Sequence, residues 1–328
     1  MEKQYENKSV VLVTAIGTAA ATTVVCELRK TGQYYIIGAD INSKVEIATS
    51  REVDEFYVFP SSVCEFEKYI EFVISFCIKK KVQYYYAIID EEVANLAAHK
   101  SRFDDIGVKL CLANPELIRI CHHKNLFFEW IRENISEIYI QSFHRLQDIE
   151  ESDFPLFVKP TEGRASNGCT RVDTMEQLRE LCSGNCIPAD VLVQKYIEGN
   201  VIAVDLVRNA VTNQSAQLQR KENLRNESGC GIAVEIIRDE RLSEICKKIM
   251  RKMNLHGVVN AEFFEINGTF RIIEINPRLS AGTSFSCQAG LNTVLNAIEI
   301  ADGRRCKFGE ISVGKHFVKR YETYETDF

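Results

Sequence analysis

Apolar and polar residues alternate along the first third of the chain in a pattern that predicts strands and helices in turn. Continuous apolar runs, typical of strands buried on both faces of a parallel sheet, lie at 9–17, 34–41, 55–60 and 82–90. Helical spacing lies between and after these runs, at 18–32, 66–81 and 91–107. Residues 1–113 are therefore predicted to form an open, doubly wound, Rossmann-like domain.

The pattern changes after residue 113 to that of a smaller α+β unit, which we place at 114–190. Asn114 before Pro115 is a good helix start, and Lys124 lies just inside the next helix. A short strand at 154–160 delivers Lys159 to its end. The loop that follows, 161–168, is rich in small residues.

Residues 191–328 are expected to form a third unit that begins with a strand broken at Gly199. Further strands are expected at 201–207 and 215–221. The clearest helix of the chain lies in 239–257, with Asp239 as its cap and an apolar stripe at Leu242, Ile245, Cys246, Ile249, Met250 and Met253. Asn267-Gly268 then predicts an antiparallel hairpin over 258–276, because this dipeptide is the strongest short hairpin signal.

Both arms of this hairpin carry an acid, Glu262 on the first and Glu274 on the second. Neighbouring strands lie about 4.8 Å apart, so the two carboxylates can converge on one face. Asn276 and Arg278 follow at alternate positions and point the same way. Two carboxylates and an amide oxygen suit Mg²⁺, and the arginine would neutralise an anion held there. The alternative is a surface hairpin with solvated charges, which the apolar Ile272, Ile273 and Ile275 disfavour because buried acids need partners.

Composition and charge narrow the classes of function. The formal net charge of -6 disfavours a general nucleic-acid binder. We find neither an apolar stretch of the roughly 20 residues needed to span a bilayer nor a signal peptide, so we expect a cytoplasmic protein with no membrane partner. The 12 cysteines are scattered through predicted elements, which favours reduced thiols. Cys182 and Cys186 form the one close pair, and a zinc site there would need two further ligands.

Dinucleotide binding is an alternative for the first unit, with Asp40 as the ribose acid. The first turn contradicts this interpretation, because it offers only Gly17 where the fingerprint needs three glycines. We therefore expect this unit to hold a substrate.

Basic residues upstream of the hairpin could bind the phosphates of a nucleotide. Lys159 ends a strand directly before the small-residue loop, whose backbone N–H groups could surround phosphates. Lys124 could reach the same phosphates, although a solvated lysine is the alternative. The edge of "QKYIEG" could pair with a purine through the Lys195 carbonyl and the Ile197 N–H.

Three segments together resemble the ATP-grasp superfamily, and within it proteins similar to the carbamoyl-phosphate synthetase large chain. They are "FVKP" with its loop "TEGRASNG", the hinge "VQKYIEG", and "AEFFEINGTFRIIEINPRLSAGTS". The resemblance covers nearly the whole chain. It implies a Rossmann-like pre-ATP-grasp domain followed by a two-lobed ATP-grasp fold, with a small lid at 114–190 and a C-terminal domain at 191–328.

The resemblance also implies roles for particular residues. ATP and two Mg²⁺ ions, or Mn²⁺ in their place, would be the cofactors. Lys124 and Lys159 would hold the phosphates, and Lys159 would act in catalysis with Arg278, which would contact an acyl phosphate. The metal ligands would be Glu262, Glu274 and Asn276. The mobile phosphate loop would use Gly163, Ser166, Asn167 and Gly168. The adenine pocket would be lined by Gln194, Lys195, Tyr196, Ile197 and Glu198.

Three departures from the family pattern limit these roles. The acid that usually binds the ribose is replaced by Asn200-Val201, so Glu198 or Asn200 would have to substitute. His123 stands where Asp commonly precedes the first lysine. Arg164 and Ala165 stand in the loop where smaller residues and glycine are usual.

The family chemistry predicts an ATP-dependent carboxylate-amine ligase that acts on a small carboxylic acid and an amine, such as amino acids. Arg220, Lys221 and Arg225 could grip an anionic substrate, with a solvated loop as the alternative. Glu91, beside Asp90 and Glu92, could attract an amine, although helix N-termini favour acids anyway. Ser280 would border the acyl site or cap a helix.

Two other functions stay open. One is half of a split carbamoyl-phosphate synthetase, because this chain has room for only one of the two modules of the large chain. The other is a nucleotide-binding regulatory protein without turnover, although a sensor could have lost any of the hairpin residues. Homodimerisation follows from the resemblance alone.

Overall fold

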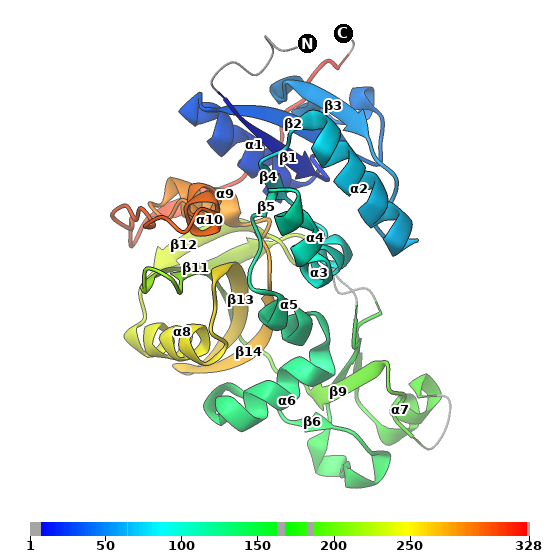
Figure 1. The fold of residues 1–328 in the computed structure, drawn as a ribbon. Helices are drawn as coiled ribbons and strands as arrows, with labels where there is room; N and C mark the ends of the chain where they lie inside the picture. Colours follow the sequence, from blue (N-terminus) through cyan, green and yellow to red (C-terminus); the bar gives the residue numbers. More distant parts are fainter. Residues whose placement is uncertain (1–7, 64, 163–167, 183–185, 327–328) are drawn as a thin grey trace.

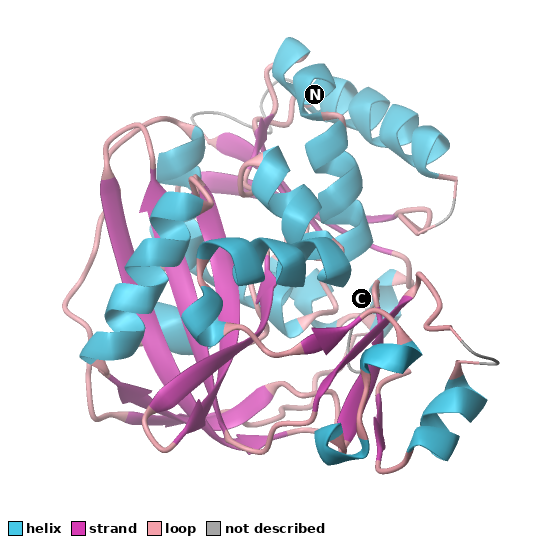
Figure 2. Cartoon of the chain, turned by 90° about the horizontal axis from the view of Figure 1, so that it is seen from below, coloured by secondary structure: helices cyan, strands magenta, loops and turns pink. Residues whose placement is uncertain are grey.

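The computed structural model describes residues 8–63, 65–162, 168–182 and 186–326, and in these ranges the strands form three sheets. Figure 1 shows the first sheet at one end of the molecule, the largest in the middle and the smallest at the other end. Figure 2 shows the molecule from below, with its helices and strands in different colours. Each cysteine that the structure describes is a free thiol, as expected. In the described part of the chain, no helix has the length and apolar character needed to cross a membrane.

The first sheet is parallel, with strand order β3-β2-β1-β4-β5, which confirms the doubly wound prediction. Its strands are β1 (Ser9–Thr14), β2 (Tyr34–Asp40), β3 (Glu55–Val58), β4 (Tyr84–Tyr86) and β5 (Lys109–Leu110). Its helices are α1 (Ala19–Thr31), α2 (Phe66–Lys80), α3 (Asp90–Ala98) and α4 (Lys100–Asp105). The single helix expected at 91–107 is therefore two helices, which meet at His99.

The small sheet is antiparallel where its pairings are defined and has strand order β6-β9-β7-β8. Its strands are β6 (Ser142–Phe143), β7 (Leu156–Pro160), β8 (Thr170–Val172) and β9 (Val191–Lys195). The neighbouring helices are α5 (Pro115–His122), α6 (Lys124–Asn134) and α7 (Met175–Leu181). Strand β9 pairs within this sheet, although the boundary proposed at residue 190 assigned it to the last unit.

The large sheet is antiparallel with strand order β14-β13-β10-β11-β12-β15. Its strands are β10 (Asn200–Asn209), β11 (Gln214–Arg225), β12 (Gly231–Ile237), β13 (Gly257–Ile266), β14 (Thr269–Asn276) and β15 (His316–Val318). Its helices are α8 (Glu240–Lys252), α9 (Thr283–Gln288) and α10 (Thr293–Ala301). The cap predicted for α8 is present, because the Asp239 carboxylate accepts from the N–H groups of Arg241 and Leu242.

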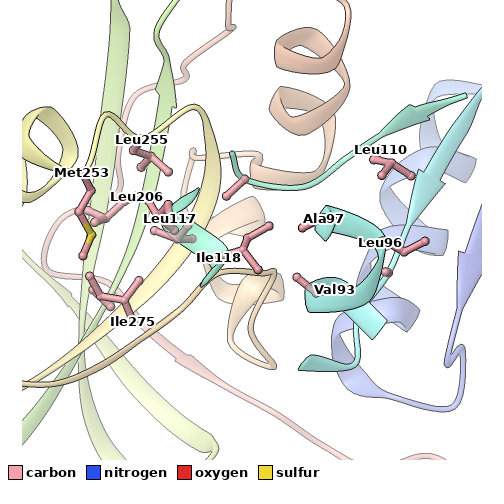
Figure 3. Packing of buried hydrophobic residues seen from close by; sticks show 14 of the residues in the cluster. Val93, Leu96, Ala97, Leu110, Leu117, Ile118, Leu206, Met253, Leu255 and Ile275 are labelled. Atoms are coloured by element: carbon pink, nitrogen blue, oxygen red, sulfur yellow. The ribbon is translucent and has the colours of Figure 1, made fainter. Parts of the chain in front are cut away.

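A continuous apolar core joins the first unit to the large sheet. Figure 3 shows α3 and α5 side by side in this core, with Val93 and Leu96 on α3 and Leu117 and Ile118 on α5. The core continues to Leu206 and Ile275 of the large sheet. A second core lies between α1, α9, α10 and the other face of the large sheet. Beside these cores, Asp90 after β4 of the first sheet contacts Arg278, just beyond the strand end at Asn276.

Candidate functional site

The hairpin of β13 and β14 places the two predicted metal-binding acids opposite each other. Asn267 and Gly268 both have positive φ, 49° and 75°, as a two-residue type I′ hairpin turn requires. The turn sets the register as far as the Phe263–Ile272 pair, and a shift of one residue beyond it places Glu262 opposite Glu274 and Asn260 opposite Asn276. A bulge after Glu262 interrupts the alternation of the strand there. The two acids therefore converge as expected, but they do so through the bulge and not through the turn alone.

The proximity of the paired acids affects the ionisation of Glu262. Burial, and then the negative charge of Glu274, raises the pKa of Glu262 to about 8. The structure partly offsets this cost with Arg225, whose Nη2 donates to Glu262 Oε2 at 2.8 Å. The same guanidinium lies 2.8 Å from Glu222, measured from Nε to Oε2. Arg225 thus bridges two acids instead of standing free for a substrate.

Asn276 links the acids to the arginine that follows them. Its Nδ2 donates to Glu274 Oε1 at 2.8 Å, and its Oδ1 accepts from Arg278 Nη2 at 3.3 Å. Arg278 in turn donates from Nε and Nη2 to the two oxygens of Asp90, at 2.7 and 2.8 Å. Burial disfavours the charge of Arg278, but the charge and hydrogen bonds of Asp90 outweigh it and raise the pKa of the guanidinium.

Lys159 is the second basic group of the site. It lies at the end of β7, only 6% exposed, with its Nζ 4.7 Å from the centre of the Phe128 ring. Burial lowers the pKa of Lys159 to about 8; the positive charge of Lys124 acts in the same direction, and Glu274 opposes it. Lys159, Lys124 and Glu274 therefore come close enough to affect one another, although they come from three different elements.

The phosphate loop predicted between β7 and β8 lies mostly outside the described residues, which include neither Gly163, Ser166 nor Asn167. Gly168 is described and has a φ of 72°. A Cβ there would approach Pro160 at 3.0 Å, so glycine suits both the conformation and the space.

The predicted adenine pocket follows β9, and several of its side chains are held by neighbours. Gln194 is buried and donates to Ser142 Oγ at 2.9 Å, and Lys195 lies 3.1 Å from Asp153. The backbone N–H of Tyr196 donates to the Pro155 carbonyl. These contacts fix the strand that leads into the hinge.

Glu198 and Asn200, the possible substitutes for the ribose-binding acid, each contact another side chain of this chain. Glu198 lies 3.6 Å from Arg171, which also covers the Tyr196 ring at 4.7 Å. Asn200 donates from Nδ2 to Glu265 Oε2 at 3.1 Å. Ile197, between these groups, is partly buried against the larger core.

The structure corrects the expectation for Arg220. Residues 214–225 form a strand and no solvated loop, and Arg220 is 1% exposed. Its Nη1 donates to Asp205 Oδ2 at 2.6 Å and to Ser286 Oγ at 2.5 Å. Because β10 pairs Ala203 with Arg220, Asp205 comes within reach on the same face two residues on. Arg220 is therefore part of a buried network and does not present its charge to a substrate.

The other substrate candidates occupy different positions. Lys221 is partly buried on β11, opposite Ile202 of β10. Ser280 is buried, and its Oγ accepts from the Gly282 N–H at 3.2 Å just before α9, so it shapes the turn there. Glu91 is the second residue of α3, directly after Asp90. Glu92 is buried in the first unit, where Tyr69, Tyr85 and Thr14 donate to its carboxylate.

Four residues of this region were not identified from the sequence. Asp205 and Asn260 belong to the Arg220 network, with Asn260 Nδ2 donating to Asp205 at 2.8 Å. Glu222 forms an ion pair with Arg225, and Lys319 donates to the Ala281 carbonyl at 2.6 Å beside the loop after Arg278. Their signal was weak because Asp205, Glu222 and Asn260 come from three different strands, and Lys319 lies just beyond a fourth, so only the fold brings them together.

Two alternatives from the sequence find no support in the described residues. The Asp40 carboxylate accepts from the N–H groups of Gly17 and Asn42, and a Cβ on Gly17 would meet Ile47 at 2.8 Å, so the first turn is closed. Within the described ranges, no group of three or more His, Cys, Asp or Glu side chains could hold a metal ion. Among the described residues, Cys182 and Cys186 therefore have no further ligands for a zinc ion. The hairpin site was predicted with two acids and an amide, so it does not contain three side chains of these types.

Two family models match this chain. The first, described as ATP-grasp in the biosynthetic pathway with Ter operon, matches residues 188–319. The second, described as a PylC-like N-terminal domain, matches residues 11–111. The two matches cover the large sheet and the first sheet respectively.

Curated relatives point to the same superfamily. The carbamoyl phosphate synthase large chain of Thermoanaerobacter sp. (strain X514) is 26% identical over 221 residues, which is 61% of this chain and 20% of that protein. The match therefore spans about a fifth of the length of that relative.

Solved structures share the fold over nearly the whole chain. Biotin carboxylase from Campylobacter jejuni, crystallised as a β,γ-ATP complex, has a TM-score of 0.75 at 15% identity and covers 93% of this chain and 74% of that one. An L-amino acid ligase from Bacillus licheniformis has a TM-score of 0.66 at 16% identity and covers 93% and 75%.

Proposed function

Because this chain belongs to the ATP-grasp superfamily, we propose that it is an ATP-dependent ligase that joins a carboxylate to an amine. The reaction would pass through an acyl phosphate and release ADP and phosphate. The observation that carries the proposal is the row of Glu262, Glu274, Asn276 and Arg278, formed across two strands and faced by Lys159.

The donor set fits magnesium. Glu262 and Glu274 face each other in the register, and burial followed by the negative charge of Glu274 raises the pKa of Glu262. Glu262, Glu274 and Asn276 would hold the ions, with Arg225 releasing Glu262. When bound, Mg²⁺ would neutralise the phosphate charges of ATP, as it does in phosphoryl transfer generally.

The first chemical step needs a phosphate held in line with the attacking carboxylate. A carboxylate oxygen of the acid attacks the γ-phosphorus, the bond to the bridging oxygen breaks, and ADP leaves. Lys159 and Lys124 would bind and orient the phosphates in this step. Burial of Lys159 makes its charge more effective, since water screens it poorly.

The second step forms the carbon–nitrogen bond. An amine attacks the acyl carbon, the resulting tetrahedral oxyanion expels phosphate, and the nitrogen loses a proton. Arg278 would stabilise that oxyanion, because Asp90 keeps its guanidinium charged and oriented. This account uses positioning and electrostatics and requires no nucleophile from the protein.

The test is substrate-dependent release of ADP. Mg-ATP is incubated with a pool of amino acids and small carboxylic acids, and ADP and new masses are measured by coupled assay and mass spectrometry. We expect ADP to form in proportion to a product of condensation. Glu274→Gln serves as the inactive control. Nucleotide binding with no turnover in any pool would contradict the ligase proposal and favour a regulatory protein.

Half of a split carbamoyl-phosphate synthetase is the second candidate, favoured by the match to the large chain of that enzyme. It predicts ATPase activity stimulated by bicarbonate in the absence of any other acid. Homodimerisation and a cytoplasmic location stay predictions, and light scattering on the purified chain tests the first.

A further inference from the structure

The arginine of the site is held by a residue from a different unit. Asp90 is the first residue of α3 and follows β4 of the first sheet, whereas Arg278 follows β14 of the large sheet. Both carboxylate oxygens are used: Oδ1 accepts from Nε at 2.7 Å and Oδ2 from Nη2 at 2.8 Å. The side chains are 20% and 18% exposed, so solvent has limited access to the pair.

This two-point contact fixes the plane of the guanidinium. A bidentate arginine–carboxylate pair restrains orientation as well as position. Asp90 accepts along the edge of the guanidinium that Nε and Nη2 form. The edge formed by Nη1 and Nη2 therefore points away from Asp90. On that edge Nη2 also donates to Asn276 Oδ1 at 3.3 Å, while Nη1 donates to the Leu279 carbonyl at 3.3 Å. Both are long contacts that a stronger acceptor could replace.

We infer that Asp90 is a positioning residue for the ligase reaction, which holds Arg278 so that its Nη1–Nη2 edge faces the acyl phosphate. The inference rests on the proposed function. The acyl site would then be built from two units, because Asp90 of the first unit orients Arg278 of the last unit. The α3–α5 core seats α3 against the large sheet and thereby sets the position of Asp90.

A purely structural role is the competing explanation, because the pair also ties two units together. The chain offers a matched control in Asp302, directly after α10. Its carboxylate accepts from Tyr84 of β4 at 2.9 Å and from Lys109 of β5 at 2.5 Å. Asp302 therefore joins the same two units through an ionic contact, and none of these partners belongs to the site.

The experiment compares Asp90→Asn, Asp90→Glu and Asp302→Asn in the full chain. We expect Asp90→Asn to lower kcat by about 10²-fold, the scale of a misplaced catalytic group, while KM for ATP stays within about two-fold. Asp90→Glu keeps the charge and should recover part of kcat. Asp302→Asn should lower the thermal midpoint comparably but leave kcat unchanged. Equal kcat values for Asp90→Asn and Asp302→Asn would overturn the inference.

A second measurement separates this inference from the proposed function. In protein labelled with ¹⁵N at arginine Nε, the Arg278 signal is assigned by its loss in Arg278→Lys. We expect that signal to be protected from exchange in the wild type and in Asp302→Asn, and to lose protection in Asp90→Asn. Protection that persists in Asp90→Asn would overturn the inference even if the enzyme proved active on no substrate. Absence of turnover in the wild type, with protection lost only in Asp90→Asn, would instead refute the ligase proposal alone.

Discussion

Glu262 and Glu274 face each other across β13 and β14, and the cation that Glu262 contacts is Arg225, at 2.8 Å. Two acids in register would repel each other on an ordinary sheet. Their arrangement therefore costs stability, which a bound cation would restore.

Glu274→Gln should weaken binding of Mg-ADP by more than about 10²-fold, since even outer-shell partners of metal ligands contribute 10- to 100-fold. The substitution keeps the shape of the side chain but removes its charge. Isothermal titration with and without Mg²⁺ measures the effect. Glu244→Gln, on the exposed face of α8, is the control and should bind as the wild type. Equal affinities for both variants would contradict a metal site at the hairpin.

Arg225→Ala should destabilise the protein without nucleotide by about 2 kcal/mol, because Glu222 and Glu262 lose their partner in a half-buried site. Saturating Mg-ADP should recover much of this loss, since the ions take over the neutralisation. Urea unfolding measures both effects. Arg145→Ala removes an exposed ion pair and should change stability by less than about 0.5 kcal/mol. A loss that Mg-ADP leaves unchanged would show that Arg225 and the metal do not share Glu262.

Lys159 should make nucleotide affinity depend on pH. Its pKa in the free protein is lowered to about 8 from the ordinary 10.5, so it loses its positive charge as the pH rises through about 8. The affinity for ADP without Mg²⁺ should therefore fall between pH 7 and 9; Mg²⁺ is left out because Glu262, whose pKa is raised to about 8, gains its charge in the same range and would bind the ion more tightly. Fluorescence titration across this range checks the prediction, and a flat profile would contradict it.

The same shift should affect folding stability with the opposite sign. Between about pH 8 and 10.5 the unfolded chain holds a proton on Lys159 that the folded protein has released. The contribution of Lys159 to the free energy of unfolding should therefore rise across this window and be least favourable below pH 8. Lys159→Met should remove this contribution, stabilise the protein at pH 7 and abolish Mg-ADP binding. A less stable Lys159→Met protein at pH 7 would show that the buried amine has a compensating partner.

Gly257→Ala should be one of the most destabilising small substitutions in the chain. Its φ is 138°, and a Cβ there would lie 2.6 Å from the Ala113 Cα, where the first unit joins the large sheet. Because the obstacle is backbone, we expect a loss of about 3 kcal/mol or more. Gly303→Ala has a positive φ of 67° but open space, and should cost about 1 kcal/mol. Similar losses of stability for the two variants in thermal unfolding would show that the backbone around Ala113 moves to make room for the new Cβ at Gly257.

Local patterns predicted the elements well because their causes are local. The apolar runs at β1 and β2, the Asp239 cap of α8 and the Asn267-Gly268 turn each act within a few residues. The hairpin turn determined the register only as far as the Phe263–Ile272 pair, and the bulge beyond that pair, which the sequence did not predict, brings Glu262 opposite Glu274. By contrast, β12 and β15 were not predicted, and the break between α3 and α4 was missed.

The sequence by itself determined which groups the hairpin offers: an acid on each arm, with an amide and an arginine following the second acid at alternate positions, and a loop of small residues upstream. Only the tertiary structure decided which partners they meet. Arg220 looked like a substrate group and is buried against Asp205, while Asp90 looked like a helix-start acid and holds Arg278. The reason is physical: spacing sets which face of a strand a side chain occupies, but its charge partners come from strands and helices far away in sequence, and packing alone brings them together.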